Sequence, residues 1–198
     1  MGTLDRLIEE VSPLARDSQT EDICIGVHWT LVTLRRASGL CGGLSSTLSG
    51  GPGEHHHGGG PPVRQAGHLQ DLSPLELLTL VHSSSMLEVS VGVATLNALI
   101  EVDESACRDV NAADVLADHG AGRHIAMVGH FPFTQELRDT AARLSVLELE
   151  PGEGDLPAAE APKVLPEADV VGLTGTSLLN GTFDSLIRLC RPDAFVIM

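Results

Sequence analysis

Basic residues are scarce in this sequence. It contains 12 Lys and Arg residues against 27 Asp and Glu residues, which gives a formal net charge of −15 at pH 7. Nucleic acids and anionic membrane surfaces attract proteins that carry a basic surface. The composition therefore argues against both as partners.

Long apolar runs and secretory features are also missing. The N-terminal stretch MGTLDRLIEE is acidic and amphipathic, unlike a signal peptide. The longest apolar run, Val89 to Ile100, falls well short of the roughly 20 residues that span a bilayer. The four cysteines lie far apart without a C-x-x-C pair, which favours free thiols over disulfides or a zinc knuckle. Together these features predict a cytoplasmic protein.

Common catalytic signatures are absent as well. The sequence has no H-E-x-x-H, G-x-S-x-G or Walker motif, so zincin proteases, common serine hydrolases and P-loop enzymes lose their usual support. The segment Gly129 to Pro132 lacks the second and third glycines of the dinucleotide motif G-x-G-x-x-G. Glu148 and Glu150 do lie about 20 residues downstream, where such folds carry a ribose-binding carboxylate. That spacing alone is a weak indication of nucleotide binding.

The first half of the chain has an α+β pattern. Residues Ile23 to Leu31 alternate with a period of two, which is typical of a strand. A turn at Arg35 to Gly39 leads into a second strand around Leu40 to Leu48, so we expect an antiparallel hairpin. His28 would then share a strand face with Cys24, and we interpret it as a half-buried structural residue.

Two helices are expected after the hairpin. Ser73 to Glu76 and Ser85 to Glu88 both match the capping box, and the second opens a long helix that reaches Ile100. Within that helix Asn97 is an amide among apolar residues and needs a partner if it is buried. A hairpin followed by a helical pair predicts an α+β domain over residues 1–104.

A Gly- and Pro-rich loop, Gly50 to Pro62, separates the hairpin from the helices and contains His55, His56 and His57 beside Glu54. Adjacent histidines can hold a divalent ion, but they lack the fixed spacing of a selective site. We therefore expect adventitious metal binding or none in this loop.

The second half, residues 105–198, alternates strands and helices, which predicts a parallel βαβ sheet. The expected strands and helices are strand 124–128, helix 133–144, strand 145–149, strand 169–173, helix 182–190 and strand 194–198. The sequence ends inside an apolar strand at Met198, so we expect a sheet that is truncated or that pairs with another subunit as a homo-oligomer.

Two turns of this parallel sheet form the predicted site. Gly129 to Thr134 follows the first strand, at the edge where ligands bind in open parallel sheets. Thr174 to Ser177 and Asn180 to Thr182 follow a later strand, and their hydroxyl and amide groups suit an anionic or polyhydroxylated ligand. Turn formation and helix capping explain the same residues equally well.

Three blocks of the sequence resemble those of the family described as putative heavy-metal chelation. They are SMLEVSVGVATLNA (85–98), VGHFPF (128–133) and LTGTSLLNGT (173–182). The resemblance implies an enolase N-terminal-like domain joined to a Rossmann-like domain, with a ligand in the cleft between them. The residues it implies at the site are Gly129, His130, Phe131, Thr174, Gly175, Thr176 and Asn180, with Glu88 and Asn97 on the opposite side.

Three functions follow from these observations. The first is a protein that binds a metal ion or a metal-chelating small molecule, with a divalent metal ion as the candidate cofactor. The second is a transferase with a nucleotide-like cofactor, bound through Glu148 or Glu150, and the third is a non-catalytic assembly subunit. If the protein is an enzyme, His130 is the residue suited to acid–base work near neutral pH.

Overall fold

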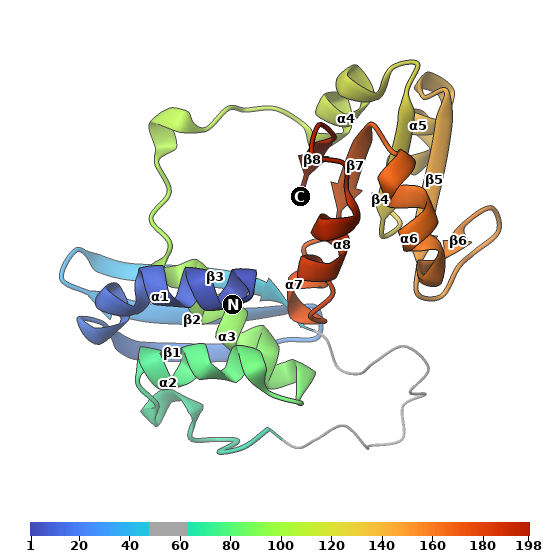
Figure 1. Ribbon diagram of the computed structural model, residues 1–198. Coiled ribbons are helices and arrows are strands. Elements are labelled where there is room, and N and C mark those ends of the chain that lie inside the picture. Colours follow the sequence, from blue (N-terminus) through green and yellow to red (C-terminus); the bar gives the residue numbers. More distant parts are fainter. Residues whose placement is uncertain (48–62) are drawn as a thin grey trace. The chain divides into compact units, whose positions relative to one another are not determined.

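The computed structural model of the protein describes residues 1–47 and 63–198 (Figure 1). Contacts divide the chain into two compact units, Met1–Asp103 and Glu104–Met198. Within the described ranges, no helix is both long and apolar enough to cross a membrane. The predicted histidine-rich loop at His55, His56 and His57 lies outside the described residues.

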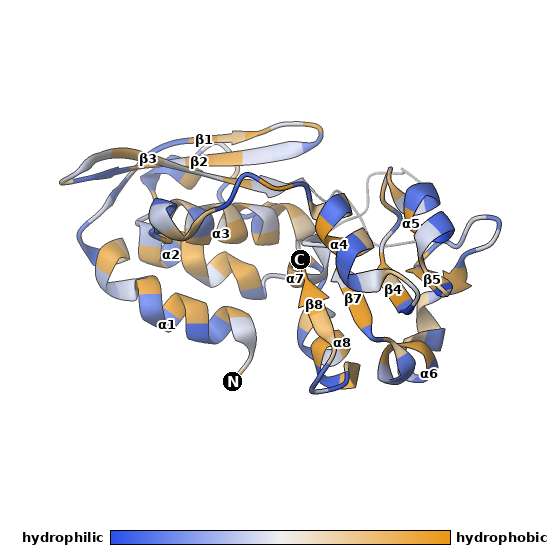
Figure 2. Cartoon of the chain, turned by 90° about the horizontal axis from the view of Figure 1, so that it is seen from above, coloured by the Kyte–Doolittle hydropathy of each residue, from blue (hydrophilic) through white to orange (hydrophobic). Residues whose placement is uncertain are grey.

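The first unit consists of an antiparallel sheet with helices packed on one face (Figure 2). The strands, in spatial order, are β1 (Gln19–Ile25), β2 (Trp29–Arg36) and β3 (Gly39–Ser46). The helices are α1 (Thr3–Arg16), α2 (Pro74–Thr79) and α3 (Met86–Leu99), with 3-10 turns at Leu69–Asp71 and Leu80–His82. This is the α+β architecture that the sequence predicted.

The predicted strand Ile23 to Leu31 is wrong, because the chain turns back within it. The Gly26 N–H donates to the Trp29 carbonyl over 2.9 Å and closes a tight turn between β1 and β2. His28 lies in this turn rather than on a strand face with Cys24. The alternation of apolar residues continues across the turn, so periodicity alone could not reveal it.

Helix α3 fills the centre of the first unit's core. Val91, Ala94 and Ala98 pack in the same cluster as Val32 and Leu34 of β2. The opposite face of the sheet is open, where Trp29 and Leu31 are exposed. The inward and outward faces of β2 therefore follow the alternation expected of a half-buried strand.

The first predicted capping box is confirmed and the second is wrong. The Glu76 N–H donates to Ser73 Oγ, and the Ser73 N–H donates to the Glu76 carboxylate. Ser85 precedes α3, but its side chain makes no capping hydrogen bond. The Glu88 carboxylate instead accepts hydrogen bonds from Arg64 and Ser83.

The second unit is a parallel sheet with helices on both faces. Its strands, in spatial order, are β6 (Leu156–Pro157), β5 (Arg143–Glu148), β4 (His124–Val128), β7 (Val170–Leu173) and β8 (Phe195–Ile197). The helices are α4 (Ala112–Gly120), α5 (Thr134–Thr140), α6 (Ala161–Val164), α7 (Thr176–Leu179) and α8 (Phe183–Leu189), with 3-10 turns at Glu104–Ala106, Ala158–Glu160 and Leu165–Glu167. All four neighbouring strand pairs are parallel. The predicted Rossmann-like βαβ sheet is confirmed.

Two apolar clusters cover the two faces of this sheet. One contains Leu116 of α4 and Leu137 of α5, and the other contains Ala161 of α6 and Leu186 of α8. Figure 2 shows these two pairs of helices on opposite sides of the strands. Because both faces are covered, the central strands β4 and β7 are almost entirely buried.

Candidate functional site

The strand order of the second unit creates a gap at the carboxyl ends of β4 and β7. The chain leaves β4 through α5, which packs in one apolar cluster, and leaves β7 through α8, which packs in the other. The two connections therefore diverge to opposite faces of the sheet. In open parallel sheets, ligands bind in the crevice formed at such a point.

Gly129 shapes the turn at the end of β4. Its φ of +101° lies in the region that favours glycine, and its N–H donates to the Leu147 carbonyl over 3.0 Å. A Cβ at this position would lie 3.1 Å from the Cβ of Thr174. Glycine is therefore required both by the backbone conformation and by the close approach of the β7 turn.

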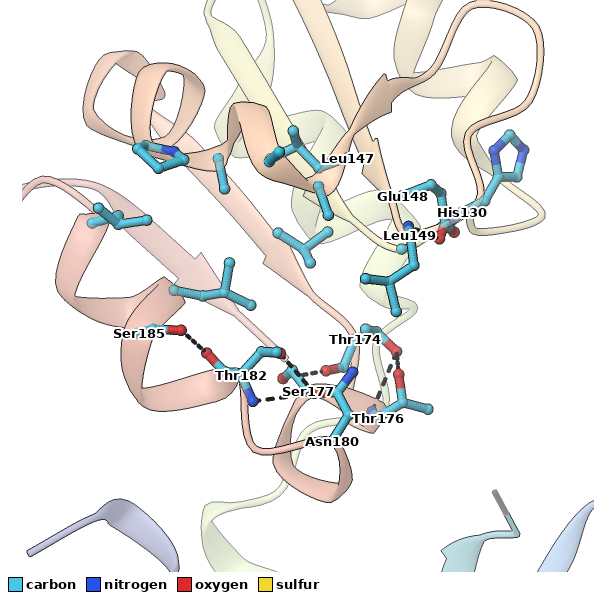
Figure 3. Close-up of a pocket in the computed structure, with 18 residues that line it drawn as sticks. His130, Leu147, Glu148, Leu149, Thr174, Thr176, Ser177, Asn180, Thr182 and Ser185 are labelled. Carbon is cyan, nitrogen blue, oxygen red and sulfur yellow. Dashed lines mark hydrogen bonds between the residues drawn. The ribbon is translucent and has the colours of Figure 1, made fainter. Parts of the chain in front are cut away.

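His130 follows this glycine and has two acidic neighbours. Its backbone N–H donates to the carboxylate of Glu148, and its Nδ1 lies 3.4 Å from Oδ2 of Asp155. Figure 3 shows the imidazole directed away from Thr174 and Thr176. His130 therefore contributes mainly its backbone to this side of the site.

Phe131, the next predicted site residue, serves packing. It packs against the cluster that contains Leu137, and its ring stacks against that of Phe133 with a centroid distance of 5.3 Å. Phe131 is one of the bulky residues that distinguish this turn from the glycine-rich turn of a dinucleotide motif, and its side chain is part of the core around α5.

The turn after β7 presents hydroxyl groups. Oγ1 of Thr174 and Oγ1 of Thr176 are 3.0 Å apart, and the Ser177 hydroxyl donates to the Thr174 carbonyl over 2.7 Å. Gly175 lies between the two threonines with open space around it. Oδ1 of Asn180 accepts hydrogen bonds from the backbone N–H and the hydroxyl of Thr182. Part of this polar capacity therefore stabilises the turn itself, as capping and turn residues do.

A pocket of about 470 Å³ connects the two turns (Figure 3). This volume lies within the roughly 300–1,000 Å³ range of small-molecule sites. The polar lining residues are His130, Glu148, Thr174, Thr176, Ser177, Asn180, Thr182 and Ser185. The rest of the lining is Gly129 and an apolar wall of Val128, Leu147, Leu149, Ala158, Ala159, Ala161, Pro162, Leu186 and Leu189.

Glu88 and Asn97 belong to the first unit and have partners there. Glu88 is buried and holds Arg64 and Ser83, while the Asn97 side-chain amide donates to the Leu44 carbonyl over 2.8 Å. Asn97 thus finds its partner in β3, although the residue is exposed rather than buried. A role for these two residues in ligand binding stays a prediction.

Burial and hydrogen bonding have opposite effects on the Glu88 carboxyl. Burial raises its pKa. The hydrogen bonds from Arg64 and Ser83 together lower the pKa by more than burial raises it, so the pKa lies below the usual value of a glutamate. Glu88 is therefore held in its charged form inside the first unit.

Sequence reasoning missed Asp155 and the apolar wall. The Asp155 side chain is 5% exposed, and its Oδ2 accepts from the Gly152 N–H over 3.1 Å. Its Oδ1 is buried and has no hydrogen-bond partner among the residues that the structure describes. Asp155 and the wall residues Ala158 to Pro162 lie in a Pro- and acid-rich stretch without clear periodicity, which resembled a simple linker.

Among the residues that the structure describes, the pocket does not combine the ligands of a directly bound heavy metal. Within residues 1–47 and 63–198, no group of three or more His, Cys, Asp or Glu side chains could hold a metal ion. The described lining provides one imidazole, one carboxylate and several hydroxyl and amide groups. Soft metals prefer thiolate ligands, and imidazole suits many transition metals. The described donor set therefore fits the polar groups of an organic molecule better than a bare ion.

Comparisons with known proteins identify two family models that together cover most of the chain. Residues 8–100 match one model and residues 111–198 match another, and each model bears the description "Putative heavy-metal chelation". The division between Asp103 and Glu104 lies in the gap between these matches. No functionally curated protein matches the chain.

Two solved structures have the same fold. A protein with unknown function from the DUF364 family of Pyrococcus horikoshii has a TM-score of 0.78 and 20% sequence identity, over 98% of this chain and 77% of that one. A DUF364 protein from Desulfitobacterium hafniense has a TM-score of 0.73 and 23% identity, over 95% of this chain and 76% of that one. The resemblance noted in the sequence is confirmed, and this chain belongs to the putative heavy-metal chelation family.

Proposed function

We propose that the second unit binds a metal-chelating small molecule, alone or as its metal complex, in the pocket beside Gly129 and Thr174. The observation that carries the proposal is the place of this pocket, at the carboxyl ends of β4, β5 and β7 where the connections diverge. This is the position at which open parallel sheets bind their ligands.

The polar side of the pocket supports a ligand with oxygen-rich groups. The Asn180 amide nitrogen makes no hydrogen bond to any residue that the structure describes, and Asn180 lines the pocket. The hydroxyls of Thr174 and Thr176 are each able both to donate and to accept. Carboxylate and hydroxyl groups, which chelators use to hold metals, are suitable partners for these side chains.

The apolar wall supports an organic ligand over a hydrated ion. Residues such as Leu147, Leu186 and Leu189 provide a surface that binds carbon atoms rather than water. Small-molecule sites typically combine such a surface with a few polar groups that set the orientation. In this proposal the chelator itself coordinates the metal, and the protein recognises the chelator.

Isothermal titration calorimetry with citrate, nitrilotriacetate and their zinc complexes tests the proposal. We expect at least one of these to bind, and Thr176→Val to weaken binding about fivefold, because one hydrogen bond contributes about 1 kcal/mol. Thr140→Val is the matched control, since Thr140 is exposed and does not line the pocket.

Two results would contradict the proposal. One is that Thr176→Val and Thr140→Val weaken binding equally, or that none of these compounds binds. The other is binding that disappears when His55, His56 and His57 are changed together to alanine, because the metal would then be held by the histidine-rich loop.

A further inference from the structure

Glu148 is the acidic residue of the described pocket lining and the last residue of β5. One carboxylate oxygen accepts from the His130 N–H, and the other accepts from the Leu149 N–H over 3.2 Å. These two contacts fix the carboxylate between the turn after β4 and the end of β5.

The Glu148 carboxylate has acceptor capacity left for a ligand. A carboxylate offers about four lone-pair sites, and the two backbone contacts occupy one on each oxygen. Among the described residues, Glu148 forms no ion pair with a lysine or arginine. One free site on each oxygen is the arrangement that accepts hydrogen bonds from two adjacent hydroxyl groups.

The place of Glu148 in the sheet also points to a ribose. In dinucleotide-binding folds with strand order 3-2-1-4-5, an acidic residue at the end of the second strand binds the ribose hydroxyls. The order β6-β5-β4-β7-β8 reproduces that arrangement, with β4 as the first strand and β5 as the second. Glu148 therefore occupies the ribose position, whereas the exposed Glu150 does not line the pocket.

The same turn lacks the features that bind phosphate. Dinucleotide folds hold the pyrophosphate with free backbone N–H groups of the glycine-rich turn. In this chain the His130 N–H already donates to Glu148, and the Phe131 N–H donates to the Thr134 hydroxyl over 3.1 Å. The pocket thus has a carboxylate, Glu148, at the position that binds ribose in dinucleotide folds, beside a turn that is unsuited to binding phosphate.

Apolar residues beside Glu148 provide a surface for a base. Leu149 follows Glu148 directly, and Ala158, Ala159 and Pro162 line the same pocket beyond β6. A planar base packs well against such side chains, while its ribose reaches the carboxylate.

We propose that Glu148 binds the 2′ and 3′ hydroxyls of a ribonucleoside that carries no phosphate group. The inference rests on the proposed function in one respect, that the pocket binds a small organic molecule. It adds the chemical class of a ligand and assigns the residue that selects it.

Titration of the full-length protein with adenosine, guanosine, cytidine and uridine tests this assignment. We expect at least one ribonucleoside to bind, and its 2′-deoxy counterpart and its 5′-monophosphate each to bind at least about tenfold more weakly. Glu148→Gln should reduce ribonucleoside affinity by a similar factor, because an amide offers one acceptor oxygen instead of two. Glu150→Gln removes the same charge outside the pocket and should leave the affinity unchanged.

Several results would overturn the assignment. They are equal binding of the ribo- and 2′-deoxynucleosides, tighter binding of the monophosphate, equal effects of Glu148→Gln and Glu150→Gln, or no nucleoside binding. The comparison of nucleosides needs no variant, so it remains decisive if Glu148→Gln fails to fold. Chelator binding without nucleoside binding would support the proposed function and contradict the ribose assignment. Nucleoside binding without chelator binding would contradict the proposed chelator ligand and support the ribose assignment.

Discussion

Glu88 is a charged residue buried in the interior of the first unit. Its side chain is 1% exposed and contacts the guanidinium and backbone of Arg64. We expect Glu88→Gln to lower the free energy of unfolding by about 1–3 kcal/mol, because the substitution weakens the hydrogen bonds that Arg64 and Ser83 donate to this buried side chain. Urea denaturation at pH 7 measures this change, and an unchanged midpoint would contradict it.

The lowered pKa of Glu88 gives a pH dependence with a defined sign. Because the folded-state pKa lies below the unfolded value of about 4.3, the stabilisation is complete above that value and is lost as pH falls through the folded pKa. Denaturation of the wild type between about pH 5 and 2 should therefore show a loss of stability that is smaller in Glu88→Gln. A parallel loss in both proteins would show that other carboxyl groups dominate.

Gly129 and Gly175 form a matched pair of glycines in the turns of the site. Gly129→Ala should cost about 1–3 kcal/mol in stability and weaken ligand binding, because its φ is +101° and the new Cβ would press on Thr174. Gly175 has a φ of −60° and open space around it, so Gly175→Ala should be tolerated. Thermal unfolding with and without ligand compares them, and equal effects of both changes would contradict this account.

Local signals in the sequence predicted single residues only where the partner is close along the chain. The Ser73–Glu76 box follows such a fixed spacing. Glu88 has the same apparent spacing from Ser85, but Arg64 lies 24 residues away and takes the carboxylate instead. Such distant partners leave no trace in a single sequence.

The contact between β3 and α3 depends on a glycine. A Cβ at Gly43 would lie 2.0 Å from the Ala94 carbonyl oxygen and 2.3 Å from the Ala98 nitrogen. We expect Gly43→Ala to destabilise the first unit by about 3 kcal/mol or more, since neither backbone can move away without opening the core. Unfolding monitored by Trp29 fluorescence measures the loss.

Gly42→Ala is the control for this contact. The new Cβ would face the open side of the sheet, with Leu31 Cδ1 at 3.5 Å as its nearest neighbour. Its effect should stay within about 0.5 kcal/mol, the usual range for surface changes. Similar losses for Gly42→Ala and Gly43→Ala would show that the helix does not constrain this position.

Elements with strong periodicity were predicted well, and short irregular ones were not. The strand predicted at 124–128 matches β4, and the helix predicted at 182–190 overlaps α8. Strand β6 and helix α6 were missed because two- and four-residue elements are too short to show a period. Helix α6 and the 3-10 turn before it supply part of the apolar wall of the pocket, so the sequence indicated polar lining residues but not this part of the wall.

For the whole molecule, the order of strands and helices along the sequence was the main basis for predicting the fold. An α+β stretch followed by alternating strands and helices predicted the two architectures, and the three quoted blocks predicted the family. The sequence left the choice between Glu148 and Glu150 open, because the contact of Glu148 with the turn after β4 forms only when β4 and β5 lie side by side.

The measurement that tests the central claim most directly is ligand mapping by ¹H–¹⁵N correlation NMR on the full-length protein. Zinc citrate and the four ribonucleosides are the probes, added stepwise to saturation. The account predicts saturable shifts of the backbone amides of Gly129, Glu148, Thr174 and Asn180. Shifts confined to the histidine-rich loop or to the first unit, or no saturable shift with any probe, would contradict it.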